Sequence, residues 1–191
     1  KCMMNGQPPE VMPLAPGYVL DTSALVMLVH LEILSQVANV IPLIVPRRLV
    51  MELEFLLSSS TQPDSVLHAV EGTPILVSDP DSYLAWKSRW TAAIAIIAER
   101  CTSVDSLPMT KFDPEIRRRL EDDLLGPAGA RAIAIAVDRS IPMLCDDGVA
   151  AQIALQVSGV KRVATYELLS YLQATGHMGR EAVAEAIARL A

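Results

Sequence analysis

Short apolar segments that alternate with helical stretches constrain the fold of this chain most strongly. Strand-like runs rich in aliphatic and β-branched residues occur at 18–20, 41–46, 73–78, 141–145 and 161–165. Between them, apolar residues recur at helical spacing, as in 47–57, 81–101 and 130–139. Strands that alternate with helices pair in parallel and are covered by helices on both faces. The sequence therefore predicts an α/β fold, a three-layer α/β/α sandwich around a mostly parallel sheet of about four or five strands.

The chain reads as one domain with two short flanking segments. Residues 1–17 contain four prolines and are expected to form an irregular lead-in. Residues 18–175 hold all the strand–helix alternation, with a charged helix expected at 113–125 and a turn at 126–129. Residues 176–191 predict a C-terminal helix with one apolar stripe. Such a stripe closes the protein's own core or pairs with a second copy, so a homodimer is one expectation.

Composition excludes several classes of protein. At 51% hydrophobic residues the chain can build a substantial core, so disorder is excluded. No apolar run reaches the ~18 residues of a membrane span, and the first residues lack the apolar centre of a signal peptide. Three cysteines without metal-ligand spacing are typical of a reducing, cytoplasmic setting. With a net charge of −6, RNA binding requires a local basic patch, for which Arg117, Arg118 and Arg119 are candidates.

Acidic residues end two of the predicted strands. Asp21 follows the first strand, and Asp146 and Asp147 follow the strand at 141–145. Sites in parallel sheets lie beyond the carboxyl ends of the strands, so these acids are expected at one edge. Converging carboxylates repel one another unless a cation binds, and hard oxygen ligands suit Mg²⁺ or Mn²⁺. The alternative for Asp21, favoured when this residue is considered alone, is that it caps the following helix.

Three segments resemble the conserved motifs of PIN domains, which are metal-dependent nucleases that include the VapC-type toxins. The segments are YVLDTSALV, VPRRLVMELE and IPMLCDDGVAAQIA, in the family's order and spacing, and the likeness extends from about residue 18 to 175. The resemblance implies an RNA-cleaving activity dependent on Mg²⁺ or Mn²⁺, with single-stranded RNA as substrate. It also implies a cognate inhibitor protein as a further partner.

The resemblance assigns site residues one by one. Asp21 matches the first metal ligand, and Ser23 matches the hydroxyl residue that supports it. Glu52 matches the second acid, six residues after Pro46, although helical periodicity alone does not decide between Glu52 and Glu54. The alternative to metal binding for Glu52 is an ion pair with Arg48 one turn earlier.

The last motif supplies the remaining ligands. Asp147 fits the main ligand position, and Asp146 is a neighbouring alternative. Cys145 stands where the family often has threonine.

One departure from the family pattern concerns the acid expected about eighteen residues before Asp147. That position is Gly129, with Arg131 close by and with Asp122 and Asp123 one or two turns upstream. Two hypotheses follow: a weak metal-dependent endoribonuclease, or a catalytically degenerate PIN domain that binds RNA or a protein. A receiver-like phosphotransfer domain is a weaker third reading, because it requires a lysine at the end of a late strand.

Overall fold

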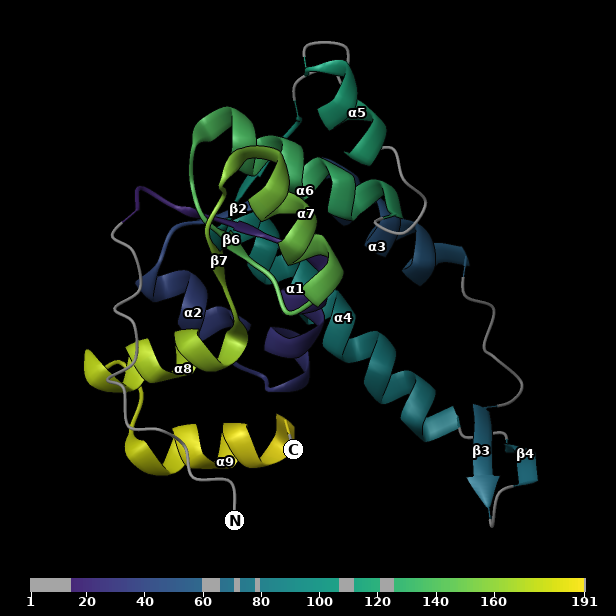
Figure 1. Cartoon of the computed structure of the whole chain (residues 1–191). Helices are drawn as coiled ribbons and strands as arrows, with labels where there is room; N and C mark the ends of the chain where they lie inside the picture. The colour runs from purple at the N-terminus through teal and green to yellow at the C-terminus, as the bar shows by residue number, and fades with distance from the viewer. Residues whose placement is uncertain are drawn as a thin grey trace.

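A five-stranded, entirely parallel sheet forms the centre of the protein. The computed structural model describes residues 15–59, 66–70, 73–77, 80–106, 112–120 and 126–190. The strand order in the sheet is β5-β2-β1-β6-β7 (Figure 1). The strands are β1 (Tyr18–Leu20), β2 (Leu43–Pro46), β5 (Thr102–Val104), β6 (Met143–Leu144) and β7 (Arg162–Val163).

The central strand β1 explains why these runs are apolar. It pairs with β2 on one side and β6 on the other, with Val19 opposite both Ile44 and Met143. All three residues of β1 are buried. A parallel strand covered on both faces reads as a continuous apolar run, and that is the pattern of YVL. The first acid of the site, Asp21, follows directly where β1 leaves the sheet.

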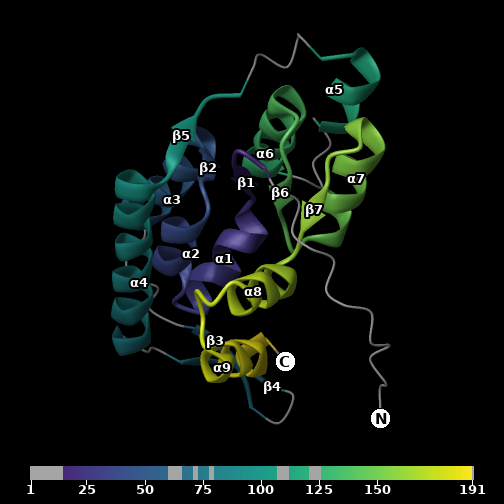
Figure 2. The ribbon, with the colours of Figure 1, turned by 90° about the vertical axis from the view of Figure 1, so that its left-hand side faces the viewer.

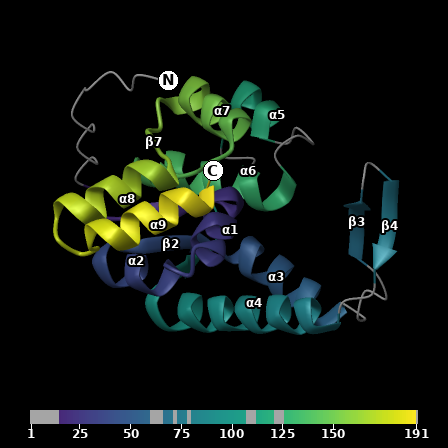
Figure 3. The same ribbon diagram turned by 90° about the horizontal axis from the view of Figure 1, so that it is seen from below.

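Helices cover both faces of the sheet, as Figures 2 and 3 show. One face packs with Leu20 and Leu144 into a large apolar cluster. The helices of that cluster are α1 (Thr22–His30), α2 (Leu34–Val40), α3 (Arg47–Ser59), α4 (Pro80–Arg100), α8 (Thr165–Ala174) and α9 (Arg180–Leu190). The other face packs with Val19 and Met143 against α5 (Pro114–Leu120), α6 (Gly126–Arg139) and α7 (Gly148–Ser158). The three-layer sandwich expected from the sequence is confirmed.

The strand predicted at 73–78 does not belong to this sheet. Residues Thr73–Val77 form β4, which pairs antiparallel with β3 (Val66–Val70) in a separate two-stranded ribbon. Figure 1 shows the ribbon beside the start of α4, away from the parallel strands. The edge position is taken by β5 instead, whose sequence TSV is short, polar and partly exposed. An apolar run predicts a strand but not the strand's partner.

The turn predicted at 126–129 is wrong, because α6 begins at Gly126. Gly126 enters the helix with a φ of +64°, a conformation that favours glycine. Pro127 then occupies the first turn, where backbone N–H groups have no acceptor within the helix, so the N–H that proline lacks is not needed. Gly129 therefore lies inside a helix and is buried. Of the charged helix predicted at 113–125, the structure describes 114–120, and Asp122 and Asp123 lie outside the described residues.

The C-terminal helix α9 packs on the body of the protein. Val183 and Ala186 of its apolar stripe are buried in the main cluster, whereas Ile187 is 47% exposed. The stripe therefore closes the chain's own core, and pairing with a second copy stays a prediction.

Among the described residues, no single helix is long and apolar enough to cross a membrane. Helices α1 and α2 reach that length and composition only as a pair that bends by 115°.

The buried cluster makes one prediction about stability. Leu25 of α1 is completely buried, so Leu25→Ala should lower the free energy of unfolding by about 3 kcal/mol through lost apolar contact and a residual cavity. Urea unfolding measures the change. Leu155→Ala, at a side chain that is 56% exposed, is the matched control and should cost less than about 1 kcal/mol. Equal losses in both variants would contradict the assignment of the core.

Candidate functional site

Asp21 leaves the sheet at the carboxyl end of β1 and begins α1. Its backbone N–H donates to the Leu144 carbonyl at 3.0 Å, which continues the pairing with β6. Its carboxylate Oδ2 accepts from the Ser23 backbone N–H at 3.1 Å and from the Ser23 hydroxyl at 2.7 Å. Asp21 is 4% exposed and is the N-cap of α1. The helix-capping alternative weighed for this residue is therefore what the structure shows.

The Ser23 hydroxyl joins the two acidic strand ends. While it donates to Asp21, its oxygen accepts from the backbone N–H groups of Asp146 and Asp147, both at 3.0 Å. Those two N–H groups lie just past the end of β6 and need an acceptor outside the strand ladder. Ser23 therefore fixes the β6–α7 turn against the β1–α1 junction.

Cys145 adds a thiol donor to the same junction. Its Sγ lies 3.5 Å from Asp21 Oδ2 and 3.3 Å from the Asp147 carbonyl oxygen. Burial, and then the negative charge of Asp21, raise the pKa of the Cys145 thiol to about 12. The sulfur therefore keeps its proton and acts as a hydrogen-bond donor, as the threonine hydroxyl of the resembled motif can.

The neighbouring acids Asp146 and Asp147 serve different helices. Asp147 is the N-cap of α7, where its Oδ1 accepts from Val149 N at 2.7 Å and Ala150 N at 3.2 Å. The Asp146 carboxylate points to the start of α8 and accepts from both the backbone N–H and the hydroxyl of Thr165. Both oxygens of Asp146 are thus engaged with Thr165, whereas Asp147 uses one oxygen.

Glu52 lies on α3 and is paired with a cation. The Arg48 Nε–H donates to its Oε1 at 2.8 Å, one helical turn away. This is the ion pair named as the alternative for Glu52. Glu54 is exposed on the same helix. Gly129 carries no side chain at the position of the third family acid, and Arg131 on α6 donates to the Ser106 hydroxyl at 2.9 Å.

The site residues do not all converge. In the described part of the chain, no group of three or more His, Cys, Asp or Glu side chains is arranged to hold a metal ion. The Ser23 hydroxyl links the Asp21 carboxylate to the backbone N–H of Asp147, whereas Glu52 and Asp146 have partners of their own.

Two carboxylates still fit one kind of metal site. The hydrogen bonds described above use Asp21 Oδ2 and Asp147 Oδ1, so each side chain keeps its second oxygen. Mg²⁺ is commonly held by one or two carboxylates together with water and substrate phosphates, rather than by a complete protein cage. The donor set of Asp21 and Asp147 therefore suits an ion whose shell is completed by a phosphate ligand.

A family model described as a PIN domain associated with the TPR-GreAB-C-PIN system matches residues 19–155. The chain belongs to the PIN domain family. PIN domains are generally metal-dependent and generally bind nucleic acid, and the matched region contains Asp21, Glu52 and Asp147. No curated protein sequence matches the chain.

Two contacts of this PIN domain were not anticipated from the sequence. The Arg162 Nε–H of β7 donates to the Cys145 carbonyl at 2.9 Å, and Thr165 binds Asp146. A hydroxyl residue at the start of the helix predicted at 166–175 was a usable signal for Thr165. Nothing in the sequence pattern indicates the contact of Arg162. Of the arginines at 117–119, Arg118 is paired with Glu115.

The central position of Ser23 can be tested by removing its hydroxyl. Ser23→Ala leaves the two N–H groups of the β6–α7 turn without their acceptor, so the free energy of unfolding should fall by about 2–3 kcal/mol. Chemical denaturation followed by circular dichroism gives the value. Ser170→Ala, which removes an exposed hydroxyl bonded to the Tyr166 carbonyl, should cost less than about 1 kcal/mol. A loss no larger at Ser23 would show that it does not connect the two strand ends.

The buried thiol predicts a dependence of stability on alkaline pH. The pKa of Cys145 is about 12 in the folded protein against an ordinary value of 9.0, so the unfolded chain loses its proton first. The stability linked to this thiol is therefore complete below pH 9 and declines as pH rises toward 12, by at most about 1.4 kcal/mol per pH unit. Cys145→Thr, which cannot titrate there, should lose less stability between pH 8 and 10.5 in urea unfolding. Parallel slopes for the two proteins would contradict this.

Proposed function

We propose that this PIN domain is a Mg²⁺- or Mn²⁺-dependent endoribonuclease that hydrolyses phosphodiesters of single-stranded RNA slowly. The observation that carries the proposal is the joining of Asp21 and Asp147 through Ser23 at the carboxyl edge of the parallel sheet. This edge is where sites of open α/β sheets lie. Family membership supports the choice of nucleic acid as ligand.

The residues of the chain have distinct roles in this proposal. Asp21 and Asp147 would hold the ion through the carboxylate oxygens that their helix caps leave free. Ser23 and the Cys145 thiol orient Asp21, because both donate to its Oδ2. Glu52 would contribute from α3 once Arg48 turns to a phosphate. A bound divalent cation would polarise the phosphodiester and activate water for its hydrolysis.

Weak activity follows from what the site lacks. A glycine occupies position 129, and Glu52 is neutralised by Arg48. With only Asp21 and Asp147 as candidate ligands, the ion would depend on a substrate phosphate to complete its shell, so metal and RNA should bind cooperatively. We therefore expect low metal affinity without RNA and slow turnover with it.

A second candidate function rests on the same two features of the site. The glycine at 129 and the Arg48–Glu52 pair make the region less negative than four free acids would. A less negative site repels a phosphodiester less strongly without a cation. The alternative is accordingly a PIN domain that binds single-stranded RNA without cutting it.

Asparagine variants separate catalysis from folding at this site. Asparagine caps helices as well as aspartate does, so Asp21→Asn and Asp147→Asn should keep the fold while removing a metal-binding charge. We expect each variant to cut single-stranded RNA at least about tenfold more slowly in Mn²⁺, with thermal unfolding within a few degrees of the wild type. Gel-resolved cleavage of a labelled oligonucleotide measures the rate. Unchanged cleavage in both variants would remove these residues from the mechanism.

Restoring the missing acid distinguishes the two candidate functions. Gly129→Asp should raise the cleavage rate if the site lacks only this ligand, and Gly129→Asn is the control of equal size without the charge. If neither the wild type nor Gly129→Asp cleaves RNA in Mn²⁺ while RNA still binds, the nuclease proposal fails and the binding module stands.

A further inference from the structure

A pocket lined by arginines lies beside the candidate site, at the carboxyl ends of β2 and β5. Its volume is about 360 Å³, and it is formed by the first turn of α3, the residues after β5 and the N-terminal part of α6. Arg47 and Arg48 come from α3 and Arg131 from α6. Two helices thus bring three guanidinium groups to one cavity in a chain whose net charge is −6.

The charges of this arginine pocket are only partly balanced. Arg47 lies 3.4 Å from Asp105, but both side chains are more than half exposed, and ion pairs of that kind contribute little and exchange readily. Arg48 is paired with Glu52 outside the pocket lining. The partner of Arg131 is the neutral Ser106 hydroxyl, and no carboxylate in the described part of the chain pairs with it. An anion entering the pocket would meet an excess of positive charge.

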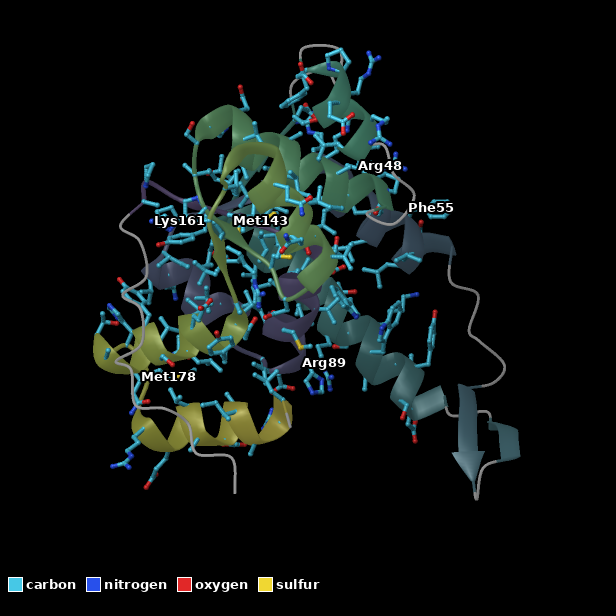
Figure 4. All side chains as sticks on the ribbon, viewed as in Figure 1. Arg48, Phe55, Arg89, Met143, Lys161 and Met178 are labelled. Carbon is cyan, nitrogen blue, oxygen red and sulfur yellow. The ribbon has the colours of Figure 1, made fainter. Side chains whose placement is uncertain are left out.

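A second pocket adjoins the first along α3 and is lined by Arg48, Met51, Glu52, Phe55 and Leu56. It has a volume of about 510 Å³, shares Arg48 and Met51 with the arginine pocket and is continued by Phe55. Residues 48, 51 and 55 share one face of the helix because they are three or four positions apart. The Phe55 side chain is 68% exposed, and Figure 4 shows both Arg48 and Phe55 along α3, away from α8 and α9.

We propose that the arginine pocket binds a phosphate group of single-stranded RNA without a metal ion, and that an adjacent base stacks on Phe55. Guanidinium groups hold phosphate oxygens through paired, charge-assisted hydrogen bonds. Exposed aromatic rings beside a basic groove are typical stacking platforms for single strands. The choice of RNA as the strand rests on the proposed function, whereas the phosphate specificity of the pocket rests on its own lining.

Binding of a phosphate in the arginine pocket would affect the ion pair between Arg48 and Glu52. Arg48 contacts Glu52 and also lines the arginine pocket. A phosphate in the pocket competes with Glu52 for the Arg48 guanidinium, so RNA binding would release the Glu52 carboxylate from its ion pair. Binding of RNA in this pocket would therefore release Glu52, which is ion-paired with Arg48 in the protein without RNA.

The test measures binding in EDTA, where cleavage plays no part. One arm titrates a fluorescent single-stranded RNA decamer with a 5′-hydroxyl, and the other follows the rise in melting temperature with inorganic phosphate. We expect Arg131→Gln to weaken RNA binding about tenfold and to reduce the salt dependence by about one counterion. It should also diminish the stabilisation by phosphate. Arg189→Gln, which removes an ion-paired arginine from α9, is the control of equal charge change.

Two further variants distinguish recognition from structural support. Asp105→Asn removes the carboxylate that competes for Arg47, so both RNA and phosphate should bind more tightly than to the wild type. Phe55→Ala should weaken RNA binding and leave the response to phosphate unchanged. A merely structural role of the pocket predicts neither result.

Each outcome decides a separate point. If RNA binds and Arg131→Gln matches Arg189→Gln, the pocket proposal is overturned while the proposed function stands. If phosphate stabilises the wild type through Arg131 but RNA does not bind in EDTA, the pocket takes a free phosphate and its role in RNA binding is rejected, while cleavage of RNA in Mn²⁺ still decides the proposed function. If neither ligand binds the wild type in EDTA, the pocket proposal fails, and the cleavage assay in Mn²⁺ decides the proposed function separately.

Discussion

The hydroxyl of Ser23 is the contact on which the geometry of the acidic edge depends. It donates to Asp21 and accepts from the two N–H groups that follow β6. One small side chain therefore pairs two N–H groups that the parallel ladder leaves without an acceptor, and also a carboxylate oxygen of Asp21. Without it, the ends of β1 and β6 would need separate partners, and the two acids would no longer be held by a common atom.

Electrostatics at this edge differ from those of a dedicated metal cage. A site with four free acids needs a cation to relieve repulsion, whereas here Asp21 faces hydrogen-bond donors and Glu52 faces Arg48. The repulsion anticipated from the sequence is therefore largely absent among the described residues. Hydrogen-bond donors of the protein hold Asp21 and Asp147 at this edge, and the Arg48 guanidinium neutralises Glu52 on α3.

Sequence patterns predicted the layers of the fold better than the contacts between them. The apolar runs at 18–20, 41–46 and 141–145 predicted the inner strands, observed at 18–20, 43–46 and 143–144, because buried parallel strands are continuously apolar. The edge strand TSV at 102–104 was missed because an exposed strand need not be apolar. The run at 73–77 was placed in the wrong sheet, since apolar character does not specify a partner.

The candidate site was predictable to the extent that its residues lie next to strand ends. Asp21, Ser23 and Asp147 follow from motif and position, but the links to Thr165 and Arg162 depend on β7 lying beside β6. The arginine pocket likewise joins residues 47 and 131, which only the folded sheet brings together. Contacts of this kind carry no local signal in the sequence.

The aspartates at the strand ends also stabilise helix starts, and this second role affects how the sequences of related proteins are interpreted. Asp21 and Asp147 cap helices, and Asp146 accepts the first N–H of α8. Selection for folding alone would keep all three, even in a descendant that had lost its chemistry. Glu52 and Gly129 lie within α3 and α6, so helix capping does not preserve an acid at either position. When homologues are compared, these two positions, rather than the strand-end aspartates, report whether a lineage still cuts its substrate.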